Sequence, residues 1–183
     1  MRWAALSAGL ALVLMAAQLA TIRTTGSALA VRIVLPTTIA LVPLALWPHR
    51  RHIGVWVMYV GLAANLAAIL ANGGLMPIER PTVASAIGEE RAAAYHAGEW
   101  IAGSKDVLVE GGRGRLPALG DGIVIRIGDR GMVASPGDLV VWAGIVVLGA
   151  EASWGWQRRR TKGTASEATR AGERAEGGAI TRT

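Results

Sequence analysis

The sequence Asn-Gly-Gly-Leu-Met-Pro at residues 72–77 and the sequence Ser-Pro-Gly-Asp at residues 135–138 decide the fold. Between them lies a polar segment, whereas the chain before it is almost wholly apolar and the chain after it begins with another apolar run. This layout is typical of a multi-span membrane protein with one sizeable exposed loop. We predict an all-α membrane protein with about four transmembrane helices in a bundle. Its parts are three N-terminal spans (3–72), an extramembrane loop (73–137), a fourth span (138–156) and a basic disordered tail (157–183).

Composition supports the membrane class. Apolar residues make up 52% of the 183 residues and charged residues only 17%, and a soluble domain usually carries more charge. The formal net charge is +6, but the excess of Lys and Arg lies mainly after Gln157, so it does not indicate nucleic-acid binding. The chain has no cysteine, which excludes disulfides, thiolate zinc sites and thiol nucleophiles.

Four apolar runs are long enough to cross a bilayer, because a helix of about twenty residues is about 30 Å long. The runs are Trp3–Ile22, Ala28–Trp47, Ile53–Asn72 and Leu139–Trp156. A cleaved signal peptide is the alternative for the first run, but its apolar part exceeds the roughly 7–15 residues of a signal core. Pro36 and Pro43 remove backbone donors from the second run, so we expect one kinked helix there, with two short helices as the alternative.

The third run carries small residues and one amide. Ala63, Ala67 and Ala71 fall on one helix face, which suits close packing against another helix. Asn65 lies near mid-membrane and should face protein, where its amide finds a partner. A ligand contact is the alternative for Asn65.

Two charged residues lie inside the apolar runs. Glu151 could belong to a proton or ion path, but it lies close to the basic residues 158–160. Arg50 or Arg51 should lie on the same membrane side, so we favour an interfacial salt bridge or an acid that snorkels to the interface. Arg32, near the start of the second run, should reach headgroups or an acidic loop residue.

Positive charge in the short flanks predicts the orientation. Arg2, the His49–His52 turn and Arg158–Arg160 fall on one side of a four-span arrangement, and basic short flanks stay in the cytoplasm. Both termini should therefore be cytoplasmic and the large loop extracytoplasmic.

The loop contains weak structural signals. Apolar spacing predicts a helix over Thr82–Ile101, although Gly88 and Gly98 weaken it. Val107–Val109 and Ile123–Ile127 are short β-like runs, and the second is followed by the turn sequence Gly-Asp-Arg-Gly. We expect a small strand pair, such as a β-hairpin, over the helix ends. The tail after Lys162 has few large apolar residues and should be disordered.

Chemical motifs are weak. The glycine-rich residues 111–115 lack the Lys-Ser/Thr ending of a phosphate-binding loop. His49 and His52 have helical spacing, but the adjacent Arg50 and Arg51 oppose binding of a divalent metal.

The residue types of a hydrolytic triad are also present in the loop. Ser104 or Ser135 could be combined with His96 and Asp121, but no nucleophile-elbow pattern accompanies them. We assign no catalytic, metal-binding or cofactor-binding residue.

Local physics explains part of the two boundary motifs. Gly73 or Gly74 can take the left-handed conformation that ends a helix, and Pro77 prevents its continuation. Ser135 and Asp138 have the spacing of a capping box, with proline between them at the first helical position.

Arg115 and Asp121 are required by no cap or turn. They could form an ion pair within the loop, and contact with a partner or ligand is the alternative.

Three motifs in order carry a resemblance: residues 72–77, residues 115–121 (Arg-Leu-Pro-Ala-Leu-Gly-Asp) and residues 135–138. Over roughly Trp3–Leu148 the chain resembles a family of bacterial integral membrane proteins known only as a domain of unknown function. The family's usual first hydrophobic segment has no counterpart before Trp3. The resemblance implies a multi-pass protein of the bacterial cell membrane and implies no activity.

The leading functional prediction is a non-enzymatic accessory or interaction protein whose loop presents a partner surface. The alternatives are a small-solute or ion carrier and, third, a membrane-embedded enzyme. The expected partners are the lipid bilayer and a membrane or extracytoplasmic protein, and no nucleic acid. The candidate motif and interaction residues are Asn72, Gly73, Gly74, Met76, Pro77, Arg115, Pro117, Gly120, Asp121, Ser135, Pro136, Gly137 and Asp138, with Asn65 and Glu151 as polar residues inside the membrane.

Overall fold

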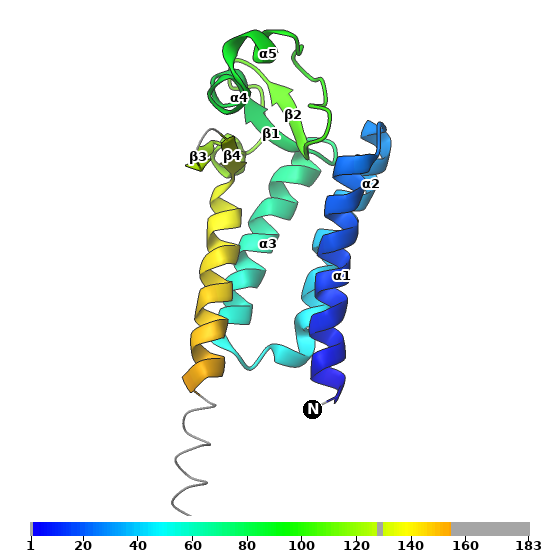
Figure 1. Cartoon of the computed structure of the whole chain (residues 1–183), viewed down its shortest axis with the longest axis vertical. Coiled ribbons are helices and arrows are strands. Elements are labelled where there is room, and N and C mark those ends of the chain that lie inside the picture. Colours follow the sequence, from blue (N-terminus) through cyan, green and yellow to red (C-terminus); the bar gives the residue numbers. More distant parts are fainter. Residues whose placement is uncertain (1, 128–129, 155–183) are drawn as a thin grey trace, which may run out of the picture.

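The computed structural model describes residues 2–127 and 130–154. Within these residues, four helices are long and apolar enough to cross a membrane. They are α1 (Arg2–Thr24), α2 (Ala28–Leu46), α3 (Ile53–Ala71) and the last helix (Pro136–Trp154). The start of α1 and the end of the last helix lie at one end of the bundle, and the loop forms a folded cap at the other (Figure 1). The predicted all-α membrane fold with one large loop is confirmed.

Helix α2 runs without interruption through both internal prolines. It begins at the N-cap Ser27, whose hydroxyl accepts from the Ala30 amide, and is followed by the 3-10 helix η1 (Trp47–His49). The Thr38 hydroxyl donates to the Gln18 amide oxygen of α1 at 2.6 Å. This bond joins the first two helices through polar side chains inside the apolar bundle.

Glycines bring α3 and the last helix into contact. A Cβ added to Gly61 would lie 2.6 Å from the Gly137 carbonyl oxygen, and one added to Gly144 would lie 2.8 Å from the Gly54 carbonyl oxygen. The predicted packing face of Ala63, Ala67 and Ala71 is wrong, since Ala63 and Ala67 are exposed. Glycine, which lacks a Cβ, allows a closer backbone approach than alanine.

Glu151 fixes the other end of this helix pair. Its carboxylate accepts from the Ile53 and Gly54 amides at 3.0 and 3.2 Å, and it lies 3.8 Å from the His52 ring. Among the described residues the ion-pair partner of Glu151 is thus His52 and not Arg50 or Arg51, whereas the basic residues 158–160 lie outside the described residues. A carboxylate satisfies the unpaired amides at the first turn of α3.

We call residues 72–135 the cap. Its elements in chain order are β1 (Met76–Glu79), α4 (Arg80–Ile87), α5 (Glu89–Ala93), β2 (Asp106–Val109), the 3-10 helix η2 (Pro117–Leu119), β3 (Ile123–Ile127) and β4 (Arg130–Ala134). Strand β1 pairs with β2 in parallel, Met76 opposite Asp106, and β3 pairs with β4 as the expected antiparallel hairpin. Arg130 and Gly131 of the predicted turn belong to β4, whereas residues 128–129 and the predicted disordered tail lie outside the described residues.

The predicted continuous helix over Thr82–Ile101 is wrong. Helix α4 ends at Gly88, which has φ +94°, and α5 ends after one short turn. The Arg80 guanidinium donates to the Ala92 and Tyr95 carbonyls and pairs with Glu110. This side chain holds the broken helical segment against the strands.

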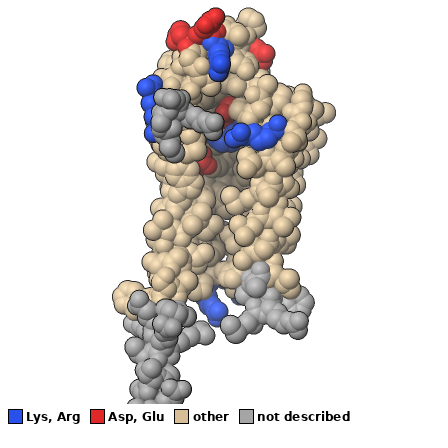
Figure 2. Space-filling model, in the orientation of Figure 1, with Lys and Arg blue, Asp and Glu red and all other residues tan. Residues whose placement is uncertain are grey.

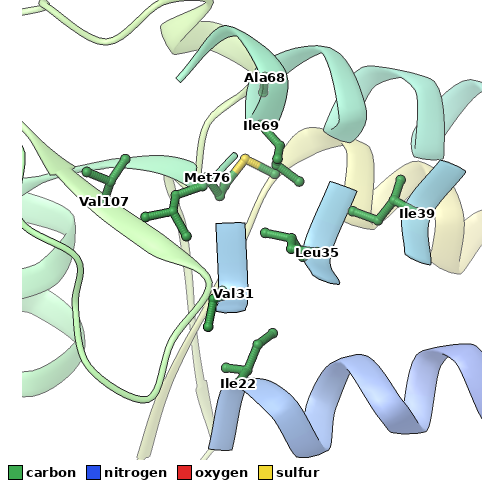
Figure 3. Packing of buried hydrophobic residues seen from close by; sticks show 9 residues of the cluster. Ile22, Val31, Leu35, Ile39, Ala68, Ile69, Met76 and Val107 are labelled. Carbon is green, nitrogen blue, oxygen red and sulfur yellow. The ribbon is translucent and has the colours of Figure 1, made fainter. Parts of the chain in front are cut away.

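Buried apolar side chains connect the cap to the bundle. Figure 3 shows Ile22 of α1, Leu35 of α2 and Ile69 of α3 converging on Met76 and Val107 of the cap strands. The cap also has its own small core around Ile78, Val83 and Leu108. Since burial of large apolar side chains contributes about 1.5–3 kcal/mol each, these clusters fix the cap on the helix ends.

Candidate functional site

The first boundary motif ends α3 and docks it on α2. Gly73 and Gly74 both have positive φ, and the Gly74 amide donates to the Ile69 carbonyl at 2.9 Å, as in a Schellman motif. The Arg32 guanidinium donates to the Gly73 carbonyl at 2.7 Å. Arg32 was predicted to reach headgroups or a loop acid, but it satisfies a carbonyl at the end of α3 instead.

Asn72 connects this motif to the second one. Its side-chain oxygen accepts from the Arg115 amide at 2.9 Å and its side-chain nitrogen donates to the Arg115 carbonyl at 2.7 Å. The same nitrogen donates to Ala68. Arg115 is therefore positioned through its backbone, and its own side chain is exposed.

Residues 117–121 pack directly on the first cap strand. Pro117 begins η2, and a Cβ added to Gly120 would lie 2.6 Å from the Pro77 carbonyl oxygen. The same oxygen accepts from the Asp121 amide at 2.9 Å. Glycine at position 120 thus allows the close approach that buries Asp121, which is 2% exposed.

The third motif starts the last helix and contacts Asn65. The Asp138 amide donates to the Ser135 hydroxyl and the Ser135 amide donates to the Asp138 carboxylate, both at 3.0 Å, so the capping box is confirmed. Asn65 donates to Asp138 at 2.7 Å and accepts from Ser135 at 2.9 Å. Pro136 is the first residue of the helix, and a Cβ on Gly137 would lie 1.9 Å from the Asn65 side-chain oxygen.

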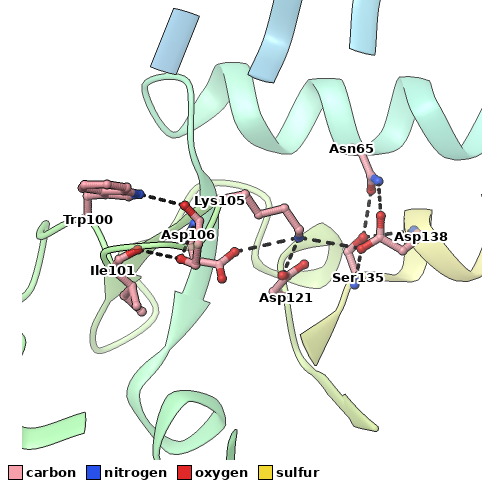
Figure 4. A network of polar contacts seen from close by, with 9 residues as sticks. Asn65, Trp100, Ile101, Lys105, Asp106, Asp121, Ser135 and Asp138 are labelled. Carbon is pink, nitrogen blue, oxygen red and sulfur yellow. Dashed lines mark hydrogen bonds and ion pairs between the residues drawn. The ribbon is translucent and has the colours of Figure 1, made fainter. Parts of the chain in front are cut away.

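Lys105 joins the second and third motifs (Figure 4). Its ammonium contacts Asp121 at 2.5 Å, Asp138 at 3.7 Å and Asp106 at 3.8 Å. We call these four residues the junction cluster. One cation faces three carboxylates where the cap meets α3 and the last helix, so the cluster carries an excess of negative charge when all are ionised.

Burial changes the acid–base behaviour of the junction cluster. Desolvation raises the pKa of Asp106 to about 7, Lys105 opposes this rise, and the neighbouring Asp121 carboxylate adds to it. Burial lowers the pKa of Lys105, but the three carboxylates outweigh this effect and raise it above its ordinary value. Near neutral pH the Lys105 ammonium is therefore charged, and Asp106 is protonated in part of the molecules.

Two carboxylate oxygens of the cluster lack a hydrogen-bond donor among the described residues. They are Oδ1 of Asp106 and Oδ1 of Asp121, and both are buried. Buried polar atoms are rarely left without a partner, because each costs about 1–3 kcal/mol. These oxygens mark a place where a proton or another donor would be stabilised.

A cavity of about 590 Å³ lies beside the cluster. Its walls come from the end of α1, from α4 and from β4, and are mainly apolar, whereas Lys105, Asp106 and Asp121 contribute polar atoms. In Figure 2, Lys and Arg side chains gather where the cap meets the helices, with acidic atoms recessed between them. An apolar cavity with a few convergent polar groups is the usual form of a ligand site.

Sequence reasoning missed Lys105 and Asp106, and the predicted ion pair of Arg115 with Asp121 is wrong because Asp121 pairs with Lys105. The sequence does offer one signal for them, because the adjacent opposite charges of Lys105 and Asp106 stand at the start of the apolar strand β2. The burial of Asp106 depends on the pairing of β2 with β1. That pairing is not visible in local sequence.

The residues of the weighed hydrolytic triad contact other groups. The Ser135 hydroxyl donates to Asn65, the Ser104 hydroxyl donates to the Ile101 carbonyl, and Asp121 faces Lys105. His49 contacts Ser7, and Gly111 and Gly112 form a turn with positive φ. Within residues 2–127 and 130–154, no group of three His, Cys, Asp or Glu side chains is arranged to hold a metal ion.

The chain matches a family of unknown function, DUF5317, over residues 2–149. The chain belongs to DUF5317. This DUF5317 match covers α1–α3, the cap and most of the last helix, and it confirms the resemblance to a family without an assigned activity. No curated protein and no solved structure matches the chain.

Proposed function

We propose that this DUF5317 protein is a non-enzymatic accessory protein of the membrane whose cap binds an amphipathic molecule. The cavity beside the junction cluster is the observation that carries the proposal. Its volume falls within the range of about 300–1,000 Å³ that is usual for small-molecule sites. Apolar walls suit a hydrocarbon chain, and the recessed charged groups suit a polar head.

The position of the cavity supports a ligand that comes from the bilayer. Leu19, Ile22 and Arg23 of α1 form part of its lining, and they belong to the last turns of an apolar helix that can span a membrane. Leu19 is 56% exposed. A molecule in the adjacent leaflet therefore reaches the cavity along α1 without crossing the cap.

We further propose that the protein is a multi-pass protein of the bacterial cell membrane with cytoplasmic termini. The short basic flanks at Arg2 and at Arg50 and Arg51 support this orientation, because such flanks are retained in the cytoplasm. The cap then faces the extracytoplasmic side, where its cavity meets the outer leaflet and any partner protein.

A small-solute or ion carrier receives less support. Its motivating residues were Asn65, Glu151 and the prolines of the second helix. Asn65 bonds the capping box and Glu151 bonds the start of α3, so both side chains have structural partners. Helix α2 is continuous between Ala28 and Leu46.

Photolabelling tests the binding proposal. The protein is reconstituted in nanodiscs with a long-chain alcohol that carries a diazirine in its chain, and adducts are located by peptide mass spectrometry. We expect adducts on α4 and β4, and fewer of them in Met132→Trp, which narrows the cavity. Leu41→Trp is the matched control, because Leu41 is 40% exposed, close to the 43% of Met132, and does not line the cavity. Equal labelling of both variants would contradict the proposal.

A further inference from the structure

We propose that the ligand of this cavity is an aminophospholipid, with its primary ammonium at Asp106 and Asp121 and its phosphate at Arg23. This inference rests on the proposed amphiphile binding and names the lipid class. Phosphatidylethanolamine is the simplest lipid with this chemistry. Three separate features of the cavity point to its ammonium, its phosphate and its chains.

The ammonium position follows from the junction cluster. Asp106 and Asp121 line the cavity, are 8% and 2% exposed, and each keep one carboxylate oxygen without a donor among the described residues. Lys105 supplies one positive charge to three carboxylates. When Asp106 holds its proton, its carboxyl hydrogen-bonds the Asp121 carboxylate. A lipid ammonium with N–H donors would replace that proton, donate to both oxygens and balance the negative charge of the two ionised carboxylates.

The phosphate position follows from Arg23. This residue lies in the last turn of α1, lines the same cavity and is exposed. It forms no ion pair with any residue in the described part of the chain. An arginine at headgroup depth binds phosphate oxygens through two parallel N–H groups, so Arg23 and the two aspartates present opposite charges to a zwitterionic head.

The chain position follows from the apolar lining. Leu19 and Ile22 of α1 form one side of the cavity, and Ile87 and Met132 of the cap form another. Leu19, Ile87 and Met132 remain partly exposed. Acyl chains that leave the cavity along α1 would cover these side chains and continue into the leaflet.

The same contacts select among headgroups. A choline head carries the same charge but has no N–H donor, so it leaves both carboxylate oxygens unsatisfied. A glycerol head has hydroxyl donors but no cation, so it cannot balance the carboxylates, and the net negative charge of its lipid is repelled by the junction cluster. An ethanolamine or other primary-amine head is the one that satisfies both ends of the site.

The test compares photolipids that differ only in headgroup. Phosphatidylethanolamine, phosphatidylcholine and phosphatidylglycerol with the same diazirine chain are presented separately to the protein in nanodiscs. We expect ethanolamine lipid to label the cavity peptides about tenfold more than choline lipid, as the loss of charge-assisted hydrogen bonds predicts. Equal labelling by all three would overturn the headgroup assignment and leave amphiphile binding intact, whereas no cavity labelling by any of them would overturn both.

Two variants test the ammonium site and the phosphate site of the lipid headgroup separately. Asp106→Asn should reduce labelling by ethanolamine lipid and leave that by choline lipid unchanged. Arg23→Gln should reduce labelling by both, because both lipids carry the phosphate. Glu90→Gln, an exposed acid of α5 that does not line the cavity, is the control and should change neither. An Asp106→Asn protein that keeps the full ethanolamine preference would contradict the ammonium site.

Discussion

Replacing Asp106 by asparagine should stabilise the cap, although it removes an acid that faces a lysine. Burial raises the pKa of Asp106 from 3.8 to about 7, so the folded protein holds this proton more tightly than the unfolded chain. Protonated Asp106 therefore makes its full contribution to the free energy of unfolding below about pH 4. This contribution is lost as the pH rises to about 7. A shift of roughly three pKa units corresponds to a destabilisation of about 4 kcal/mol once Asp106 is ionised. Asparagine has nearly the same shape and cannot ionise.

Hydrogen exchange measures this effect in the cap itself. The Leu108 amide of β2 donates to the Glu99 carbonyl at 2.9 Å, so its exchange reports cap opening. The opening free energy of Asp106→Asn should exceed that of the original protein by a margin that grows by about 2–3 kcal/mol between about pH 5 and pH 8. Glu90→Gln serves as the control. A margin that does not change with pH, or that shrinks, would refute the reasoning.

Three further predictions concern the rest of the structure. Lys105→Met leaves three carboxylates without a cation and should destabilise the cap by about 3–5 kcal/mol, with partial recovery in acid, as measured by the same exchange. Gly137→Ala places a Cβ 1.9 Å from the Asn65 side-chain oxygen and should lower the unfolding free energy in mixed micelles by about 1–3 kcal/mol or more. Gly149→Ala, with nothing within 4 Å, should have little effect; equal effects would contradict the packing argument. A cysteine at the exposed cap residue Ser85 should react with a membrane-impermeant thiol reagent in intact cells, and absence of reaction would contradict the proposed orientation.

The bundle could be predicted because its signal is local. Each span is a continuous apolar run, and the length of such a run alone decides whether it can cross a bilayer. The capping box at Ser135 and the helix end at Gly73 and Gly74 were also predictable, since both depend on residues within one turn. The glycines that pack α3 on the last helix lie about two turns apart in each helix, a spacing that was present but weaker than the alanine pattern.

The cap could not be predicted in the same way. Its helix breaks at Gly88, and its parallel strands belong to segments on either side of that break. The junction cluster brings together residues from β2, the segment after η2 and the last helix. Because these residues lie far apart in the sequence, neither the pairing of Lys105 with Asp121 nor the burial that raises the pKa of Asp106 can be predicted from local patterns.

The most direct test of lipid binding in the cap uses a chain that has no native cysteine. A cysteine at Met132, which lines the cavity, is modified with a maleimide in nanodiscs of phosphatidylethanolamine or of phosphatidylcholine, with Ser85→Cys as the cap control. The account predicts slower modification at position 132 in the ethanolamine lipid and equal rates at position 85. Equal rates at position 132 in both lipids, together with no protection relative to detergent, would contradict lipid binding in the cavity.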